Sequence, residues 1–144
     1  MRIVTKAVIK TLACATLLLP TFALAATALD KPMGMAPAII GSTWTAIEID
    51  GTAPPTARST FKITEEMKAV GNGGCNSYFA PVVLEGDTIR LGGIASTRKA
   101  CHGTMQQEAA YFAALGAART WQAEDGQLRF IDATGKIVIR FAIA

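Results

Sequence analysis

Hydrophobic and polar residues in the middle of the chain form short runs that are typical of β-strands. Residues 60–64, Thr-Phe-Lys-Ile-Thr, alternate polar and apolar side chains at the strand period of two. Residues 42–49 form a mixed run that ends at an Asp-Gly turn signal, and residues 78–84 and 88–91 flank Glu-Gly-Asp as the arms of a hairpin would. The pattern predicts strands over these four segments, and a further strand that ends near Val70.

One later segment has the helical period instead. Thr104 is a candidate N-cap, and Gln107, three residues on, completes a capping-box pattern. Gly116 is a candidate stop signal. A helix between these limits would have an apolar face made of Met105, Ala109, Phe112 and Leu115.

The chain returns to the strand pattern after this helix. Residues 118–122, 128–131 and 136–143 are separated by Asp-Gly and Thr-Gly turn signals and predict a three-stranded meander. Six to eight short strands and one helix make an α+β domain, in which the sheet must curl to cover the apolar face of the helix. We therefore expect a mostly antiparallel curled sheet, or a partly open barrel, packed on one helix.

The first 25 residues have the features of an export signal. Three basic residues lead into an apolar run at 12–19, and Ala-Leu-Ala at 23–25 fits the cleavage rule of a signal peptidase. We predict that residues 1–25 are a cleaved signal peptide, so that the mature protein is periplasmic and has no membrane span. An anchored helix is the alternative, but Pro20 interrupts the apolar stretch. Cys14 has too little apolar sequence before it for a lipid-attachment site.

Removal of this leader changes the charge balance. It takes away three of the 14 basic residues, so 11 basic and 11 acidic side chains remain. A neutral protein lacks the basic footprint of a nucleic-acid binder, and no lysine-rich stripe indicates an anionic membrane surface. Residues 26–39, which contain Pro32, Gly34 and Pro37, are predicted to be a flexible lead-in. Residues 40–144 are then one domain of a size that buries a core.

A series of residues across this domain carries a family resemblance. In chain order they are Trp44 in the first strand, Gly73, Gly74, Cys75 and Asn76, then Thr97 leading to Cys101, and Glu108 and Leu115 in the helix. In these positions, over about residues 40–144, the chain resembles the META domain family, which includes the heat-inducible bacterial lipoprotein HslJ. Lys99 stands where we would expect a residue such as methionine.

The resemblance implies a compact, mostly antiparallel β domain with one packed helix in an exported or envelope protein. Some members are linked to heat shock or to resistance to the antibiotic novobiocin. The resemblance implies no established catalytic activity, no cofactor and no agreed ligand. The leader of this chain differs from that of the lipoprotein members, so tethering to a membrane is not expected.

Cys75 and Cys101 are the only cysteines outside the leader. An even pair in an oxidising compartment is most simply a disulfide. Closing the loop from one to the other should stabilise the fold by roughly 3 to 4 kcal/mol in the chain-entropy model. Two reduced, buried thiols are the alternative.

Two chemical roles compete with this cross-link. Cys101 beside His102, with Glu108 as the orienting group, could serve a cysteine hydrolase, but adjacent residues on an extended chain point to opposite faces. The second competing role is a zinc site made of Cys75, Cys101 and His102, but structural zinc requires four ligands at recognisable spacings. We expect His102 to be a solvated loop residue, and Glu108 to lie exposed beside Tyr111 on a flank of the helix.

The remaining candidates are structural. Gly71, Gly73 and Gly74 predict tight backbone turns, since the lysine and the following helix of a P-loop are missing. Asn76 is expected to bond local backbone. A group of aromatic residues is expected in the core, although a curled sheet can also leave a ligand cavity between such residues; the group comprises Trp44, Tyr78, Tyr111 and Trp121.

These observations favour a monomeric, non-enzymatic factor for envelope integrity or for tolerance of heat or antibiotic stress. It would act by binding an envelope protein or a small apolar molecule, without a cofactor. The cysteine hydrolase built on Cys101, His102 and Glu108 is the alternative, and a purely structural envelope accessory is a third hypothesis. The identity of the ligand and the inducing stress stay open.

Overall fold

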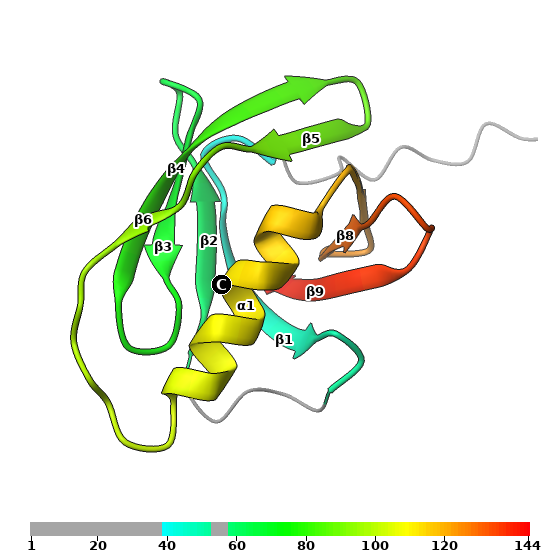
Figure 1. Cartoon of the computed structure of the whole chain (residues 1–144). Coiled ribbons are helices and arrows are strands. Elements are labelled where there is room, and N and C mark those ends of the chain that lie inside the picture. The colour runs from blue at the N-terminus through cyan, green and yellow to red at the C-terminus, as the bar shows by residue number, and fades with distance from the viewer. Residues whose placement is uncertain (1–38, 53–57) are drawn as a thin grey trace, which may run out of the picture. The chain divides into compact units, whose positions relative to one another are not determined.

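The computed structural model describes residues 39–52 and 58–144 (Figure 1). The predicted signal peptide, residues 1–25, and the lead-in up to residue 38 lie outside the described residues. In the part of the chain that is described, no helix has the length and apolar character needed to cross a lipid bilayer.

The elements follow the predicted segments closely, with bounds that differ by two residues or fewer. The described residues form nine strands and one helix: β1 (Thr43–Ile49), β2 (Thr60–Ile63), β3 (Lys68–Asn72), β4 (Ser77–Glu85), β5 (Thr88–Leu91), β6 (Ala95–Ser96), α1 (Met105–Ala117), β7 (Thr120–Glu124), β8 (Gln127–Ile131) and β9 (Ile137–Ile143). β6 could not be predicted, because two residues are too few to display a period.

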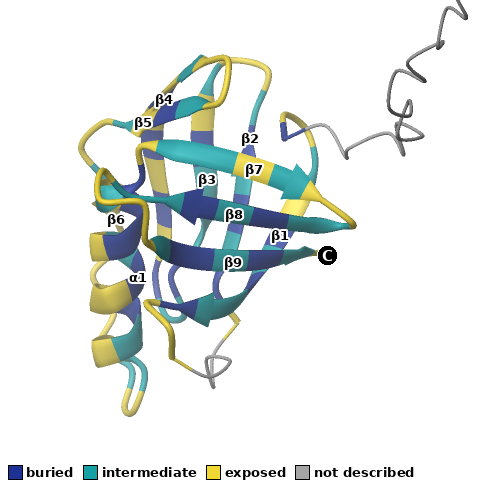
Figure 2. Ribbon diagram, turned by 90° about the vertical axis from the view of Figure 1, so that its right-hand side faces the viewer, coloured by how far each residue is buried: buried dark blue, intermediate teal, exposed yellow. Residues whose placement is uncertain are grey.

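The strands form one antiparallel sheet that closes on itself. Hydrogen-bonded neighbours follow the order β3-β2-β1-β9-β8-β7-β5-β4, and β4 pairs again with β3. Figure 2 shows β7, β8, β9 and β1 side by side in this wall, with α1 standing at one end of them. The predicted curled antiparallel sheet packed on one helix is therefore confirmed: eight strands close the barrel, and β6 is an additional strand on β4.

β4 is shared between two partners along one of its edges. Its second half pairs with β5, from Val82 opposite Leu91 to Glu85 opposite Thr88. Its first half pairs on the same side with β6, through Tyr78 opposite Ser96. Because β5 and not β6 continues the ring to β7, β6 has β4 as its single strand neighbour among the described residues.

Helix α1 packs mainly on β9, with further contacts to β1 and β5. It buries Glu108, Tyr111, Ala114 and Leu115. The predicted apolar face was therefore right for Leu115 and wrong for Met105 and Ala109, which are exposed, while Phe112 is half-buried. The buried face is rotated toward Glu108 and Tyr111, because their polar atoms find hydrogen-bond partners inside, whereas the pattern placed Glu108 exposed on a flank.

The predicted capping box is also wrong. Thr104 is the N-cap residue, but its side chain makes no capping hydrogen bond, and its hydroxyl donates to the carbonyl of Cys101 instead. The side-chain amide of Gln107 donates to the hydroxyl of Ser59, at 3.3 Å. The hydroxyl of Thr104 therefore stabilises the turn before the helix, and the side chain of Gln107 links the helix to Ser59 next to β2.

A cluster of aromatic rings lies within a hydrophobic core that is otherwise aliphatic. Phe130 packs on Phe61 and Phe141 with ring centroids 5.0 and 5.1 Å away. Of the aromatic residues expected in the core, Trp44, Tyr78 and Tyr111 are buried. Trp121 is only half-buried, and its indole N–H donates to the carbonyl of Gly86.

Candidate functional site

Cys75 and Cys101 are joined by a disulfide, with their Cα atoms 6.0 Å apart. Cys75 lies in the turn between β3 and β4, and Cys101 lies just before α1. His102 is exposed in the turn that follows, as predicted. A sulfur in a disulfide is not a thiolate and therefore offers no nucleophile or metal ligand.

The Glu108 carboxylate lies next to this cross-link and is buried, with 4% of the residue exposed. One of its oxygens accepts hydrogen bonds from the backbone N–H groups of Cys75, at 3.0 Å, and Asn76, at 2.6 Å. The other accepts from the side-chain N–H of Asn76, at 2.7 Å. The expectation of an exposed Glu108 was wrong, because three donors at one turn compensate for its loss of hydration.

These contacts also set the charge of Glu108. Burial alone would raise the pKa of this carboxyl group, but the hydrogen bonds from Asn76 and from the backbone of Cys75 outweigh burial and hold the pKa below its ordinary value. The group is therefore ionised at neutral pH. Within the described residues, no hydrogen bond joins it to His102, so the three residues of the hydrolase hypothesis do not form a triad.

Asn76 connects the same turn to the segment that precedes the helix. Its side-chain oxygen accepts from the hydroxyl of Thr97, at 2.8 Å, and from the backbone N–H of Lys99, at 2.7 Å. Its side-chain nitrogen donates to the carbonyl of Lys99, at 3.1 Å. The expectation that Asn76 bonds local backbone was wrong, since these partners are more than 20 residues away along the chain.

The glycine cluster allows the helix to approach this turn. A Cβ atom on Gly73 would lie 2.6 Å from the Phe112 ring and 2.9 Å from Glu108. A Cβ atom on Gly71 would lie 2.0 Å from the carbonyl oxygen of Thr60. Gly74 has a φ of +127°, which side chains rarely allow. The prediction of a tight backbone passage is confirmed.

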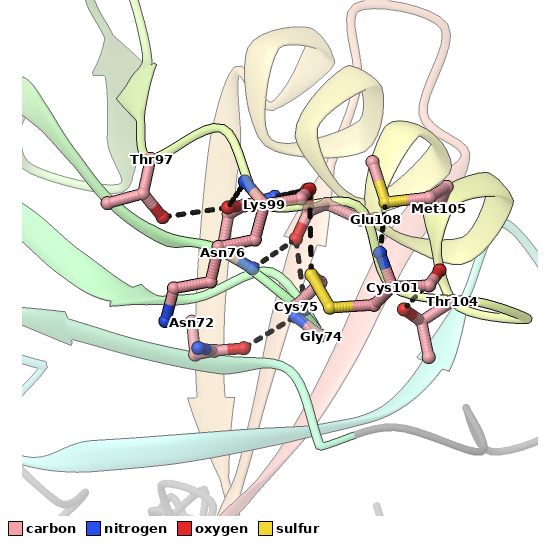
Figure 3. Close-up of a disulfide and its surroundings, with 10 residues drawn as sticks. All are labelled: Asn72, Gly74, Cys75, Asn76, Thr97, Lys99, Cys101, Thr104, Met105 and Glu108. Carbon is pink, nitrogen blue, oxygen red and sulfur yellow. Dashed lines mark hydrogen bonds between the residues drawn. A yellow bond between two sulfur atoms is a disulfide. The ribbon is translucent and has the colours of Figure 1, made fainter.

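Figure 3 shows how these contacts join three parts of the chain: the turn at residues 73–76, the extended segment at 95–101, and the first turns of α1. The extended segment is held by the disulfide, by the hydrogen bonds of Asn76 with Thr97 and Lys99, and by the pairing of β6 with β4. Across residues 39–52 and 58–144, no group of three or more His, Cys, Asp or Glu side chains could hold a metal ion.

A surface groove of about 360 Å³ lies over this junction. One wall is the chain at residues 96–100, and the other is α1, with Met105, Ala109 and Phe112. Arg98 and Lys99 are exposed on the first wall, and Met105 is 43% exposed on the second. The groove is therefore apolar on the helix side and basic on the other.

A smaller hollow of about 280 Å³ continues from this groove along β6. Ser96 and Thr97 line both, and Phe79, which is 55% exposed, lines the second. We call the larger hollow the groove from here on.

The predicted residues thus divide into two sets. Trp44 and Leu115 are core residues, whereas Asn76, Thr97, Cys101 and Glu108 build the frame under the groove. The groove wall was missed, because residues 96–100 have no periodic pattern. The sequence feature that could have indicated this wall is the Arg98-Lys99 pair, where the chain departs from the expected family pattern.

Comparison with known proteins supports this fold. The family model of the META domain matches residues 37–144. An NMR structure of a protein from Burkholderia xenovorans has a TM-score of 0.59 and 24% identity, over 74% of this chain and 83% of that one. A crystal structure of a DUF4847 family protein from Bacteroides vulgatus has a TM-score of 0.57 and 13% identity, over 76% and 96%. At these identities the two structures establish similarity of fold alone. No protein of curated function matches the sequence.

Proposed function

Because this chain belongs to the META domain family, we propose that it is an exported, non-enzymatic binding protein of the cell envelope that contributes to stress tolerance. Its binding surface is the groove between residues 96–100 and α1. The ligand is a protein or a small molecule with an apolar part.

The observation that carries this proposal is an exposed apolar wall on a rigid frame. Met105, Ala109 and Phe112 line the groove although the helix has a separate, buried face against the barrel. The disulfide and the Asn76–Glu108 contacts fix both walls. A surface that is fixed before binding loses less conformational entropy when a ligand arrives, and a volume of about 360 Å³ lies within the range of ligand sites.

A binding role fits the chemistry of this region better than the hydrolase alternative. The sulfur of Cys101 is bonded to Cys75, and the Glu108 carboxylate has its oxygens occupied by Cys75 and Asn76. A cysteine hydrolase needs a thiolate within hydrogen-bond reach of an imidazole. The proposed function makes no use of His102.

Export is supported by the leader at residues 1–25 and by the disulfide, since such bonds persist in oxidising compartments. The intact mass and free-thiol count of the protein taken from cells test this part. We expect a mature chain that starts at Ala26 and has no free thiol before reduction. An uncleaved chain with Cys75 and Cys101 reduced would contradict export.

Complementation tests the groove itself. In cells that lack the protein and show sensitivity to heat or novobiocin, the wild type should restore tolerance. Ala109→Asp, which places a charge on the apolar wall, should not. Ala110→Asp is the matched control, because Ala110 is exposed on the same helix and does not line the groove. His102→Ala should restore tolerance fully, whereas the hydrolase alternative requires that it fail.

A further inference from the structure

The edge of β6 that faces away from β4 has free backbone groups. The N–H of Thr97 donates to the carbonyl of Ser77, at 3.0 Å, and Ser96 lies opposite Tyr78 in the next pair. In an antiparallel ladder, hydrogen-bonded and non-hydrogen-bonded pairs alternate. Ser96 is therefore in a non-hydrogen-bonded pair, and its N–H and C=O point away from β4.

This edge is longer than β6 itself. The side-chain amide of Asn76 pairs with both the N–H and the C=O of Lys99, as the backbone of a neighbouring strand would (Figure 3). Residues 95, 97 and 99 thus face β4 and its extension, and by alternation the backbone groups of Ser96 and Arg98 face the other way. Within the described residues, neither backbone has a hydrogen-bond partner. We call residues 95–99 the edge segment.

The edge segment and α1 together bound the groove. A strand that paired with the edge segment would lie about 4.8 Å from it, between Ser96 and Arg98 on one side and the helix on the other. Its side chains would then meet Met105, Ala109 and Phe112. An exposed strand edge with an apolar wall beside it suits strand addition, in which main-chain hydrogen bonds give affinity and side-chain contacts give specificity.

We propose that the edge segment binds an extended segment of a partner protein, which adds to it as a strand and carries acidic and apolar side chains. This inference rests on the proposed binding function of the groove and names its ligand. Arg98 and Lys99 are exposed, and neither forms an ion pair with another described residue. Among the described residues, the one carboxylate that lines the groove, Glu108, is already occupied by hydrogen bonds. The unpaired charge on this wall is positive, and Asp or Glu complements it.

The same charges argue against a second copy of this chain as the occupant. Two copies paired edge to edge would bring Arg98 and Lys99 of each close to those of the other, and like charges across a strand pair are destabilising. Natural edge strands often carry basic residues for this purpose. The competing explanation is therefore that Arg98 and Lys99 only prevent pairing, with no strand ever added.

Ser96→Pro separates the two explanations. Proline removes the N–H that points away from β4, and β4 does not use that N–H, so the strand pair with β4 is kept. Ser96→Ala is the matched control, because it removes the hydroxyl and keeps the N–H. The probe is a short fluorescent peptide of alternating valine and glutamate, and a second peptide has lysine in place of glutamate. Binding to the full disulfide-bonded protein is followed by fluorescence anisotropy at low salt.

We expect the valine–glutamate peptide to bind the wild type and Ser96→Ala equally. Ser96→Pro should weaken that binding at least about tenfold, and the lysine peptide should bind the wild type at least about tenfold more weakly than the glutamate peptide. In NMR spectra of the wild type, the amide protons of Ser96 and Arg98 should shift and exchange more slowly when peptide is added. This second measurement does not depend on the proline variant folding.

Equal binding to Ser96→Pro and the wild type, or no binding to the wild type at about 1 mM peptide, would overturn strand addition. So would a concentration-dependent dimer of the free protein that Ser96→Pro abolishes, because the occupant would then be a second copy. If Ser96→Pro still restores stress tolerance while Ala109→Asp does not, the groove function stands and strand addition fails. If both restore tolerance, the proposed function itself fails.

Discussion

Replacing Glu108 by glutamine should lower the free energy of unfolding by about 3 kcal/mol. The change keeps the size of the side chain and removes one carboxylate oxygen and the charge. It therefore tests whether the buried carboxylate holds the turn at residues 73–76 against α1. A purely steric role for Glu108 predicts almost no effect.

The magnitude follows from the three hydrogen bonds. The amide oxygen of glutamine can still accept from the backbone N–H groups of Cys75 and Asn76, but each bond to a neutral acceptor is weaker by about 1 kcal/mol than one to a charged acceptor. The amide nitrogen then faces the side-chain N–H of Asn76, which loses this acceptor. A buried donor without that partner costs about 1 to 3 kcal/mol. Because Asn76 keeps its bond to Lys99, the low end of that range applies.

Urea denaturation followed by tryptophan fluorescence measures the difference. Glu85→Gln is the control for loss of a negative charge, because Glu85 is exposed at the end of β4; it should change the stability by less than about 0.5 kcal/mol. Both variants should keep the disulfide, which a free-thiol assay checks.

The pH dependence gives a second readout with a definite sign. The pKa of Glu108 in the folded protein lies below its ordinary value, so its contribution is full above the unfolded pKa of about 4.3 and is lost as the pH falls through the folded pKa. The wild type should therefore approach Glu108→Gln in stability only in acid. A difference below about 1 kcal/mol at neutral pH, or one that stays constant into acid, would refute the role of the carboxylate.

Three further predictions concern the frame and the core. Reducing the disulfide should lower the stability to urea by about 3.5 kcal/mol in the chain-entropy model, with unchanged stability after reduction contradicting the cross-link. Gly71→Ala should destabilise by at least about 3 kcal/mol, because its Cβ would meet backbone, whereas Gly116→Ala, with open space around it, should stabilise by up to about 1 kcal/mol in thermal unfolding. Burial raises the pKa values of Tyr78 and Tyr111, so the stability from their neutral hydroxyl groups is present below pH of about 10 and is lost as the pH rises further. In an alkaline titration, phenolate absorbance should appear only as the protein unfolds. Phenolate absorbance from the folded protein near pH of about 10 would contradict this prediction.

Apart from the two-residue strand β6, the strands and the helix could be predicted from the sequence because each has a local signal. The alternation at residues 60–64 and the Asp-Gly turns depend only on neighbours along the chain. The closure of the sheet could not be predicted, because the pairing of β5 with β7 is a short contact around Thr88 and Thr120. No local sequence pattern indicates that these two strands pair.

The frame of the site was predicted in part. Compartment and cysteine count were enough for the disulfide, and glycine spacing was enough for the tight passage at Gly73. Burial of Glu108 was missed because its three donors come from a turn more than 30 residues earlier. The edge segment also depends on a long-range contact, the pairing of the Asn76 side chain with the backbone of Lys99. Its free edge could therefore be found only in the three-dimensional structure.

The central claim is that the groove beside the disulfide is a binding surface. The most direct measurement places a photo-crosslinking amino acid at Ala109, which lines the groove, or at Ala110, which is exposed beside it and does not. The labelled protein is irradiated in living cells and the adducts are mapped by mass spectrometry. We predict that position 109 links to one defined partner segment, rich in acidic and apolar residues, and that position 110 does not. No adduct at position 109, or the same set of adducts from both positions, would contradict the account.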